Sequence, residues 1–241
     1  MKIHVLPGDA LADDFRKTAI GGETIVCREC LVEGAVRAEN LEEFWRVRAR
    51  FIEKTYGGGE EEYSRRVKGE FEMLQNHAGR EAEINLWFEY ELFCQVNLWF
   101  CLYLLRESEA KIFRVAPVVR EGGDIWKGFG GLAAADLEKC YARRAAFSKN
   151  EISLGAELWT AFQNADHEKL ERLSVYESES LPFLTEVCRA EIEKRARPRR
   201  VLEKIIAEGK TDFAEIFPAF SARAGVYGFG DAQVKRILDE I

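Results

Sequence analysis

The longest apolar stretch of the chain, residues 83–108, changes its hydrophobic period near the middle. In the first part Ile84, Leu86 and Phe88 occupy every second position, which is the pattern of a β-strand. From Glu91 onward the apolar residues recur at helical spacing and fill almost the whole circumference of a helix. Such a helix must be covered by other elements on most sides. The pattern therefore predicts a strand that leads directly into a central, buried helix.

The N-terminal region has the order strand, turn, helix, strand. Residues 3–6 are apolar and precede a Pro-Gly-Asp turn, after which residues 11–20 show helical spacing. Asp9 is suited to cap the N-terminus of this helix. Residues 23–28 predict the second strand. Because a strand–helix–strand unit uses a right-handed crossover, we expect the two strands to be parallel.

Charged helices follow the second strand. Asn40 is placed to cap a helix that ends near Gly57, and a second helix over about residues 60–77 follows. Both contain paired basic and acidic residues, which is typical of a partly exposed helical insertion over about residues 40–78. After the central helix, residues 110–119 predict a further strand.

Glycines near residue 130 suggest the boundary between two domains. Gly122, Gly123 and the glycines of residues 128–131 mark a loop. We predict an α/β Rossmann-like domain with a parallel sheet over residues 1–130 and a mainly α-helical domain over residues 131–241. The helical segments of the second domain are residues 134–146, 153–164, 167–176, 182–196, 199–208, 212–222 and 230–241.

Polar side chains gather after three of the predicted strands. Parallel strands bring the loops at their carboxyl ends to one edge of a sheet, where open α/β folds bind their ligands. We therefore expect these side chains to form one ligand site. The candidate residues are Asp9 after the first strand, Glu29 and Glu33 after the second, and Glu89, Glu91, Gln95 and Asn97 at the junction of the third strand and the central helix.

Several carboxylates in one cleft repel one another, so they either bind a cation or raise one another's pKa. Mg²⁺ and Mn²⁺ prefer oxygen ligands, and a substrate amine or ribose hydroxyls are alternative occupants. Gln95 and Asn97 would add neutral hydrogen bonds. A structural interpretation also stays open, in which Asp9 caps its helix, Glu91 interacts with the helix dipole, and the remaining acids are solvated.

Composition narrows the choice of partner. The net charge of −7 and the pI near 5.3 argue against broad binding to a nucleic-acid backbone. A small basic cluster at residues 195–200 is the exception. The N-terminus has no apolar leader, and the longest apolar run is shorter than the roughly 20 residues of a membrane span. We expect a soluble, cytoplasmic protein that binds a small molecule and neither membrane nor nucleic acid.

Several common chemistries lack their motifs in this sequence. Cys27 and Cys30 have CxxC spacing, but no second ligand pair accompanies them, so buried free thiols are expected. Ala10 provides no nucleophile after the Gly-Asp turn, and the histidines are not paired with a serine or cysteine. Neither GxGxxG nor GxxxxGK[ST] occurs, which excludes the usual dinucleotide and Walker phosphate loops.

Separated blocks of the sequence resemble a known family. IHVLPGDALADDF, VCRECLVEGAV and NLWFEYELFCQVNL together resemble the bacterial DUF1835 family, which has no assigned function. LPFLTEVCRAEIE and YGFGDAQVKRIL resemble the helical DUF3658 part that often follows it. The resemblance covers nearly the whole chain and implies an α/β domain followed by a helical one.

The motifs of that family fall on the candidate residues. Its Gly-Asp turn corresponds to Gly8 and Asp9, and its E-x-L-x-E-G loop to the acids after the second strand. Its WFE-x-D-like junction corresponds to the acids and amides at the start of the central helix. Tyr90 and Glu91 stand where the family pattern has His and Asp, so a role that needs an imidazole or a short carboxylate is not implied.

Two functional hypotheses follow. The first is an acidic ligand or metal site, with Mg²⁺ or Mn²⁺, in a metal-dependent hydrolase or transferase that acts on a nucleotide-like small molecule. The second is a non-enzymatic regulatory or adaptor protein that binds a protein or nucleic-acid partner through its C-terminal helices and the basic cluster at residues 195–200.

Overall fold

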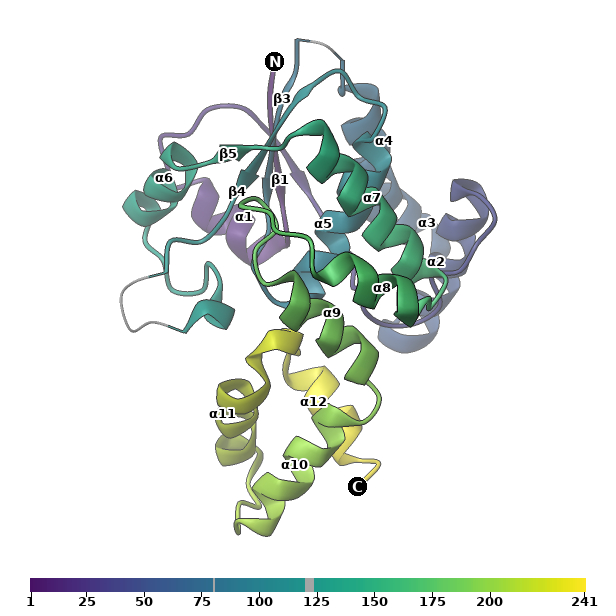
Figure 1. Cartoon of the computed structure of the whole chain (residues 1–241), viewed down its shortest axis with the longest axis vertical. Helices are drawn as coiled ribbons and strands as arrows, with labels where there is room; N and C mark the ends of the chain where they lie inside the picture. The colour runs from purple at the N-terminus through teal and green to yellow at the C-terminus, as the bar shows by residue number, and fades with distance from the viewer. Residues whose placement is uncertain (80, 120–123) are drawn as a thin grey trace.

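The computed structural model of the chain describes residues 1–79, 81–119 and 124–241. They form an α/β fold around a five-stranded sheet with the strand order β2-β1-β3-β4-β5 (Figure 1). β1 is parallel to β2 and β3, β3 is parallel to β4, and the edge strand β5 is antiparallel to β4. The α/β class and the parallel pairing of the first two strands are thus confirmed. The strands are β1 (Lys2–Leu6), β2 (Glu23–Val26), β3 (Glu83–Trp87), β4 (Lys111–Val115) and β5 (Ala145–Ala146).

Helices cover both faces of the sheet, because the inner parallel strands are apolar on both sides. On β3, Leu86 and Trp87 are both fully buried although they point to opposite faces. Trp87 packs in the apolar cluster of the first face, with α1 (Asp9–Phe15) and α6 (Ala134–Ala142). The helices of the second face are α2 (Leu41–Tyr56), α4 (Gly69–Asn76), α5 (Leu92–Leu105) and α7 (Lys149–Gln163).

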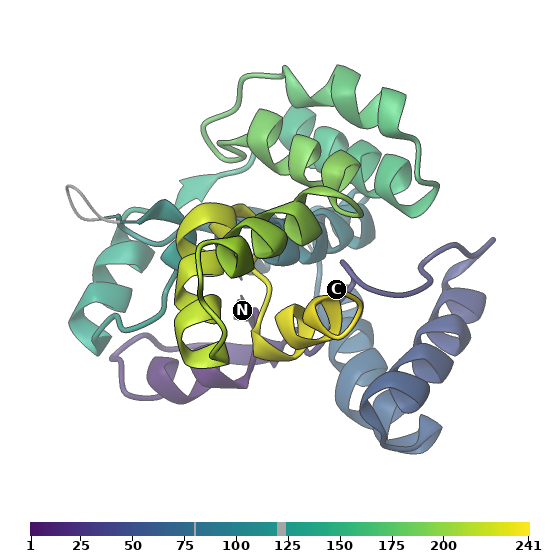
Figure 2. The same ribbon diagram turned by 90° about the horizontal axis from the view of Figure 1, so that it is seen from below.

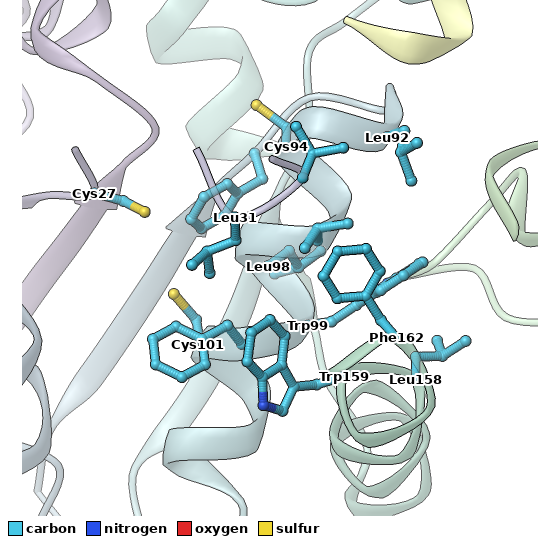
Figure 3. Close-up of a cluster of buried hydrophobic side chains, with 14 of the residues drawn as sticks. Cys27, Leu31, Leu92, Cys94, Leu98, Trp99, Cys101, Leu158, Trp159 and Phe162 are labelled. Atoms are coloured by element: carbon cyan, nitrogen blue, oxygen red, sulfur yellow. The ribbon is translucent and has the colours of Figure 1, made fainter. Parts of the chain in front are cut away.

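The central helix α5 is buried almost all round, as its sequence predicts. Trp99 of α5 and Trp159 of α7 are both fully buried and lie in the same cluster (Figure 3). Gly155 lets the two helices approach closely, because a Cβ at this position would lie 2.3 Å from the side chain of Leu102. The start of α5 is held directly after the carboxyl end of β3.

The segment between β2 and β3 is helical over the predicted range. Asn40 caps α2, since its side chain accepts a hydrogen bond from the backbone N–H of Glu43 at 2.9 Å. α2 ends at Gly57, whose φ of 79° favours glycine. The remaining turns are α3 (Glu60–Tyr63), the π-helical turn η1 (Ser64–Lys68) and α4.

The C-terminal helices α10 to α12 lie together at one end of the molecule, which Figure 2 views from below. The short helix η3 packs against α5, α9 and α11, so it joins this end to the central helix. No helix among the described residues has the length and apolar character needed to cross a membrane. The elements are α8 (His167–Ser174), α9 (Leu184–Glu193), α10 (Arg197–Ala207), α11 (Phe213–Ala224), η3 (Gly225–Tyr227) and α12 (Asp231–Leu238).

The region around residue 130 differs from the sequence prediction in one respect. The predicted helix 134–146 ends at Ala142, and its last residues form β5 instead. β5 and α7 both lie beyond the predicted domain boundary at residue 130. Nevertheless β5 belongs to the sheet and α7 packs on α5. Gly122 and Gly123, which mark that boundary in the sequence, are outside the described residues. The division into two domains stays a prediction.

Candidate functional site

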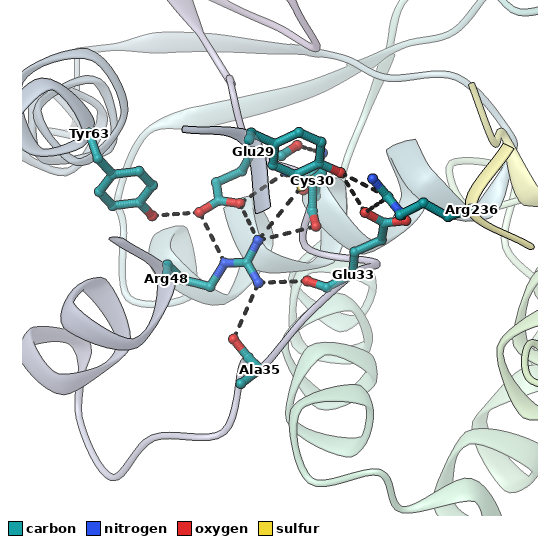
Figure 4. A network of polar contacts seen from close by, with 9 residues as sticks. Glu29, Cys30, Glu33, Ala35, Arg48, Tyr63 and Arg236 are labelled. Carbon is teal, nitrogen blue, oxygen red and sulfur yellow. Dashed lines mark hydrogen bonds and ion pairs between the residues drawn. The ribbon is translucent and has the colours of Figure 1, made fainter. Parts of the chain in front are cut away.

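Glu29, the first candidate after β2, forms a buried ion pair with Arg48 (Figure 4). The two side chains have no exposed surface, and Arg48 Nη2 lies 2.7 Å from Glu29 Oε2. The hydroxyl of Tyr63 donates a hydrogen bond to the other oxygen of Glu29. Arg48 Nη1 also donates to the backbone carbonyls of Glu33 and Ala35, at 2.6 and 3.2 Å. Glu29 and Arg48 therefore hold the loop after β2 in place.

Glu33 forms a second ion pair, with the C-terminal helix. Arg236 Nη2 of α12 lies 2.7 and 2.6 Å from the two carboxylate oxygens of Glu33. The hydroxyl of Tyr56, at the end of α2, donates to Glu33 at 2.5 Å. This contact ties α12 to the loop after β2.

Asp9 lies on the surface and pairs with Arg28. The predicted capping role is wrong: Gly8 is the N-cap of α1, Asp9 is its first helical residue, and no side chain caps the helix. Arg28 Nε donates to both oxygens of Asp9, at 3.0 and 3.1 Å, and this interaction lowers the pKa of Asp9. Arg28 also pairs with Glu70 of α4 at 2.9 Å. Asp9 thus belongs to a surface ion-pair network.

The two amides at the start of α5 bind backbone carbonyls. Asn97 Nδ2 donates to the carbonyl of Glu29 at 2.9 Å, and Gln95 Nε2 donates to the carbonyl of Glu89 at 2.5 Å. Both side chains are buried, and the side-chain oxygen of each has no hydrogen-bond partner among the described residues. The candidate carboxylates that lie next to each other are Glu89 and Glu91.

Glu89 and Glu91 form a compact cluster with Cys94 between the end of β3 and the first turn of α5. One potential ligand atom from each residue lies within 4.8 Å of the others, and no other such group occurs in residues 1–79, 81–119 and 124–241. Glu91 is the N-cap of α5 and accepts the backbone N–H of Cys94 at 3.0 Å. Glu91 and Cys94 are buried, whereas Glu89 is partly exposed, so the cluster meets solvent on the Glu89 side.

Burial and mutual repulsion favour the protonated forms of this cluster. Burial, together with the neighbouring charge of Glu89, raises the pKa of Glu91 to about 8. Burial also raises the pKa of Glu89, although the N–H of Phe129 opposes this shift. The pKa of the Cys94 thiol is raised for the same reasons, burial first and the two carboxylates second. Near neutral pH the two carboxyl groups therefore retain a proton between them.

A buried arginine lies beside the cluster without pairing with it. Arg114 of β4 is 3% exposed, and its Nη2 donates to the backbone carbonyl of Glu89 at 3.2 Å. Its Nε and Nη1 have no hydrogen-bond partner among the described residues. Burial lowers the pKa of Arg114 to about 10. Unpaired donors of a buried guanidinium are uncommon and call for a physical explanation.

Two glycine turns close over the carboxyl groups. Gly128 and Gly228 both have a φ of 65°, which favours glycine. A Cβ on Gly128 would lie 2.1 Å from the carboxyl carbon of Glu89, and one on Gly228 would lie 2.6 Å from that of Glu91. The N–H of Phe129 donates to Glu89 at 2.6 Å. Only glycine allows the backbone to approach both acids this closely, so these turns restrict the access of water.

The donor atoms of the cluster fit a divalent transition metal better than Mg²⁺. Mg²⁺ prefers oxygen ligands, whereas a thiolate beside carboxylates suits Zn²⁺ and related ions. Zinc bond lengths and a tetrahedral angle place a sulfur and an oxygen ligand about 3.5 Å apart. Cys94 Sγ and Glu89 Oε2 are separated by 4.0 Å. A small side-chain movement would bring them to ligand distance.

The sequence pattern pointed to the junction at which this cluster lies but missed some of the residues that form it. In the sequence Cys94 lies within an apolar helix, where a buried free thiol is expected. Arg114 is a charged residue within an otherwise apolar strand. A charged residue inside such a strand is the signal that identifies Arg114, since it must find a polar environment in the core. The glycines at 128 and 228 stand in glycine-rich turns, but only the structure shows which side chains they contact.

Comparisons of the chain with protein-family models, with curated proteins and with solved structures found no match.

Proposed function

We propose that the cluster of Glu89, Glu91 and Cys94 binds a divalent metal ion. The single observation that carries this proposal is the approach of the three potential ligand atoms to within 4.8 Å of one another. A bound cation would relieve the repulsion between the carboxylates and replace the proton that they retain. The buried oxygen of Gln95, which has no partner among the described residues, is a further candidate ligand in the same turn.

The reaction that we propose is metal-dependent hydrolysis or group transfer on a nucleotide-like small molecule, in a cytoplasmic protein. A divalent metal supplies Lewis-acid polarisation and lowers the pKa of bound water. Glu89 and Glu91 would hold the ion, and the glycine turns at 128 and 228 would exclude bulk water. The unpaired donors of Arg114 would attract an anionic group of the substrate.

We also propose that the α/β part is Rossmann-like and that a helical C-terminal domain follows it, in the order of the DUF1835 and DUF3658 pattern. The order β2-β1-β3-β4 supports this proposal, because doubly wound sheets with that order bind ligands at the switch point between β1 and β3. The cluster follows β3, on the edge where such a ligand would lie.

A calorimetric titration of the metal-free protein with Zn²⁺, Mn²⁺ and Mg²⁺ tests the proposal. We expect at least one of the transition metals to bind. Glu91→Gln and Cys94→Ser should each lower the affinity for this metal at least about tenfold, which corresponds to the loss of one charged contact. Glu60→Gln, an exposed acid outside the cluster, is the matched control. Absence of binding, or equal binding by all variants, would refute the metal site. Hydrolysis of a nucleotide panel with the bound metal then tests the reaction.

A basic groove supports the adaptor hypothesis as a second candidate. Arg189, Arg197, Arg200 and Lys204 line a groove of about 410 Å³ on α9 and α10, where Glu193 is the acid in the lining. Arg189 and Arg197 pair with Glu193, at 3.2 and 3.4 Å, whereas Arg199 of the same sequence cluster pairs with Glu203, at 2.9 Å. We propose that a nucleic-acid or acidic protein partner would bind this groove. Arg200→Glu should abolish an electrophoretic shift of bound RNA, whereas Arg199→Glu should not, and the reverse order would exclude the groove.

A further inference from the structure

A second concave region lies after β2, and it contains none of the metal-cluster residues. A cleft of about 480 Å³ opens between the loop after β2, the C-terminal turn of α7 with the start of α8, and the C-terminal end of α9. Residues far apart in the sequence line it, among them Arg37, Phe162, His167 and Arg195. A pocket of 300–1,000 Å³ is the usual size for a small ligand.

The cleft carries an excess of positive charge in a protein whose net charge is −7. Arg37 and Arg195 are exposed in its lining, and neither forms an ion pair or hydrogen bond within the described residues. Lys194 also lines the cleft and pairs with Glu191 at 2.8 Å. Glu191 is the acid of the lining, and burial raises its pKa. Its charge interacts with Lys194 and with Arg195, and the lining still has more basic than acidic side chains, so the cleft keeps a net positive charge.

Hydrogen bonds between distant segments hold the walls of the cleft. Gln163 Nε2 of α7 donates to the carbonyl of Val36 at 3.0 Å, and Lys194 Nζ donates to the carbonyl of Val32 at 2.9 Å. Lys194 Nζ also lies 5.3 Å from the ring centroid of Phe162. These contacts fix the loop after β2 against α7 and α9, so the cleft is preformed.

An adjoining cleft of about 450 Å³ extends the region toward α2 and α12. The two clefts share Val32, Gly34, Lys194 and Arg195. Phe51, Phe229 and Ile237 form the apolar part of the wall of the second cleft, and the Glu33–Arg236 ion pair and Glu240 also line it. Arg195 therefore lines both clefts, at the point where the positively charged cleft meets the one with apolar walls.

We propose that this pair of clefts binds a small organic phosphate. Arg37 and Arg195 would contact the phosphate, because guanidinium groups form charge-assisted hydrogen bonds to phosphate oxygens. The organic part of the ligand would lie along the apolar wall formed by Phe51 and Phe229. The site is independent of the metal cluster, since it shares no residue with it.

Titration of the protein with ADP in EDTA and low salt tests this proposal without contribution from a metal. We expect the unchanged protein to bind ADP, inorganic phosphate to compete with it, and Arg37→Ala/Arg195→Ala to weaken binding at least about tenfold. The matched control is Arg50→Ala/Arg143→Ala, which removes the same charge from exposed positions outside the clefts. Circular dichroism verifies that each variant is folded.

Each outcome of this experiment distinguishes the phosphate site from the other proposals. Glu91→Gln should bind ADP normally, because the metal cluster takes no part. No binding of ADP or phosphate, or an equal loss in the control variant, overturns the proposal. Binding of a short single-stranded RNA without binding of ADP would also overturn it, since a polymer would then be the ligand.

Discussion

Replacement of Glu91 by glutamine perturbs the acid pair with little change in shape. Glutamine keeps a side-chain oxygen that can accept the N–H of Cys94, so the cap of α5 is retained, but the ionisable group is removed. Burial, with the charge of Glu89, raises the pKa of Glu91 from 4.5 to about 8. The folded chain then holds a proton that the unfolded chain releases. The free energy of unfolding therefore has its full value below pH 4.5 and decreases as the pH rises toward 8.

The size of this effect follows from the pKa shift. One group contributes about 1.4 kcal/mol for each pH unit inside the window, so at pH 7 the ionisable Glu91 lowers the free energy of unfolding by about 3 kcal/mol. The new amide N–H₂ of glutamine costs about 1–3 kcal/mol if it finds no acceptor, but this cost does not change with pH. The slope of the difference between variant and unchanged protein is therefore the diagnostic quantity.

Urea unfolding between pH 4.5 and 8, in EDTA, measures this slope. We expect the stability of Glu91→Gln relative to the unchanged protein to increase by about 3 kcal/mol from pH 4.5 to 7. Glu60→Gln, which alters an exposed carboxyl, should follow the unchanged protein at every pH. A constant difference between Glu91→Gln and the unchanged protein would show that Glu91 ionises in the folded chain as it does in water, and would refute the electrostatic description of the cluster.

Three further predictions concern other buried groups and the metal. Arg48→Met should destabilise the protein by about 3–5 kcal/mol, because it leaves the Glu29 carboxylate buried without a cationic partner, and Glu29→Gln added to it should restore much of the loss. Failure of this rescue in urea unfolding would contradict the ion-pair assignment. His4 is fully buried, and burial lowers its pKa from 6.5 to about 4, so the folded state should lose up to about 3 kcal/mol as the pH falls through this window. The free energy of unfolding of His4→Gln should not show this decrease at low pH. If urea unfolding gave the same pH profile for the variant and the unchanged protein, the burial of a neutral His4 would be refuted. The affinity for metal should increase from pH 6 to pH 8, since the ion must displace the protons of Glu91 and of the Cys94 thiol. Calorimetry at pH 6 and 8 measures this, and equal affinities would exclude both groups as ligands.

The elements with long, regular patterns could be predicted from the sequence. The buried helix after β3 and the cap of α2 by Asn40 follow from local side chains, because period and capping are properties of neighbouring residues. β5 could not be predicted, because Ala145 and Ala146 are too few to show a period and are in a strand only through pairing with β4. The π-helical turn η1 likewise has no local signature in its charged sequence.

The partners of the candidate acids were beyond the reach of sequence reasoning. Parallel strands do bring their following loops to one edge, but the side chains of those loops are free to choose different neighbours. Glu33 binds Arg236, which is 203 positions away, and Glu29 binds Arg48 on a helix that also bears two exposed arginines, Arg46 and Arg50. Nothing local marks Arg236 or Arg48 as a partner, since the pairing depends on how α12 and α2 pack against the loop. Acidic residues that a predicted topology brings to one edge are therefore weaker evidence for a site than acidic residues that lie together without ion-pair partners in the structure.

The contrast between the paired and the unpaired acids explains why the junction of β3 and α5 is the better candidate. Glu29 and Glu33 each receive a guanidinium group, whose charge compensates theirs inside the fold. Glu89 and Glu91 receive neutral donors, namely backbone N–H groups and the Cys94 thiol, and the nearby Arg114 binds a backbone carbonyl instead of a carboxylate. Without a compensating cation, burial of two acids is unfavourable, and the chain meets this cost by retaining a proton. Glu29 and Glu33 are each paired with an arginine, whereas Glu89 and Glu91 form no ion pair among the described residues, so a metal ion at this cluster would compensate their charge.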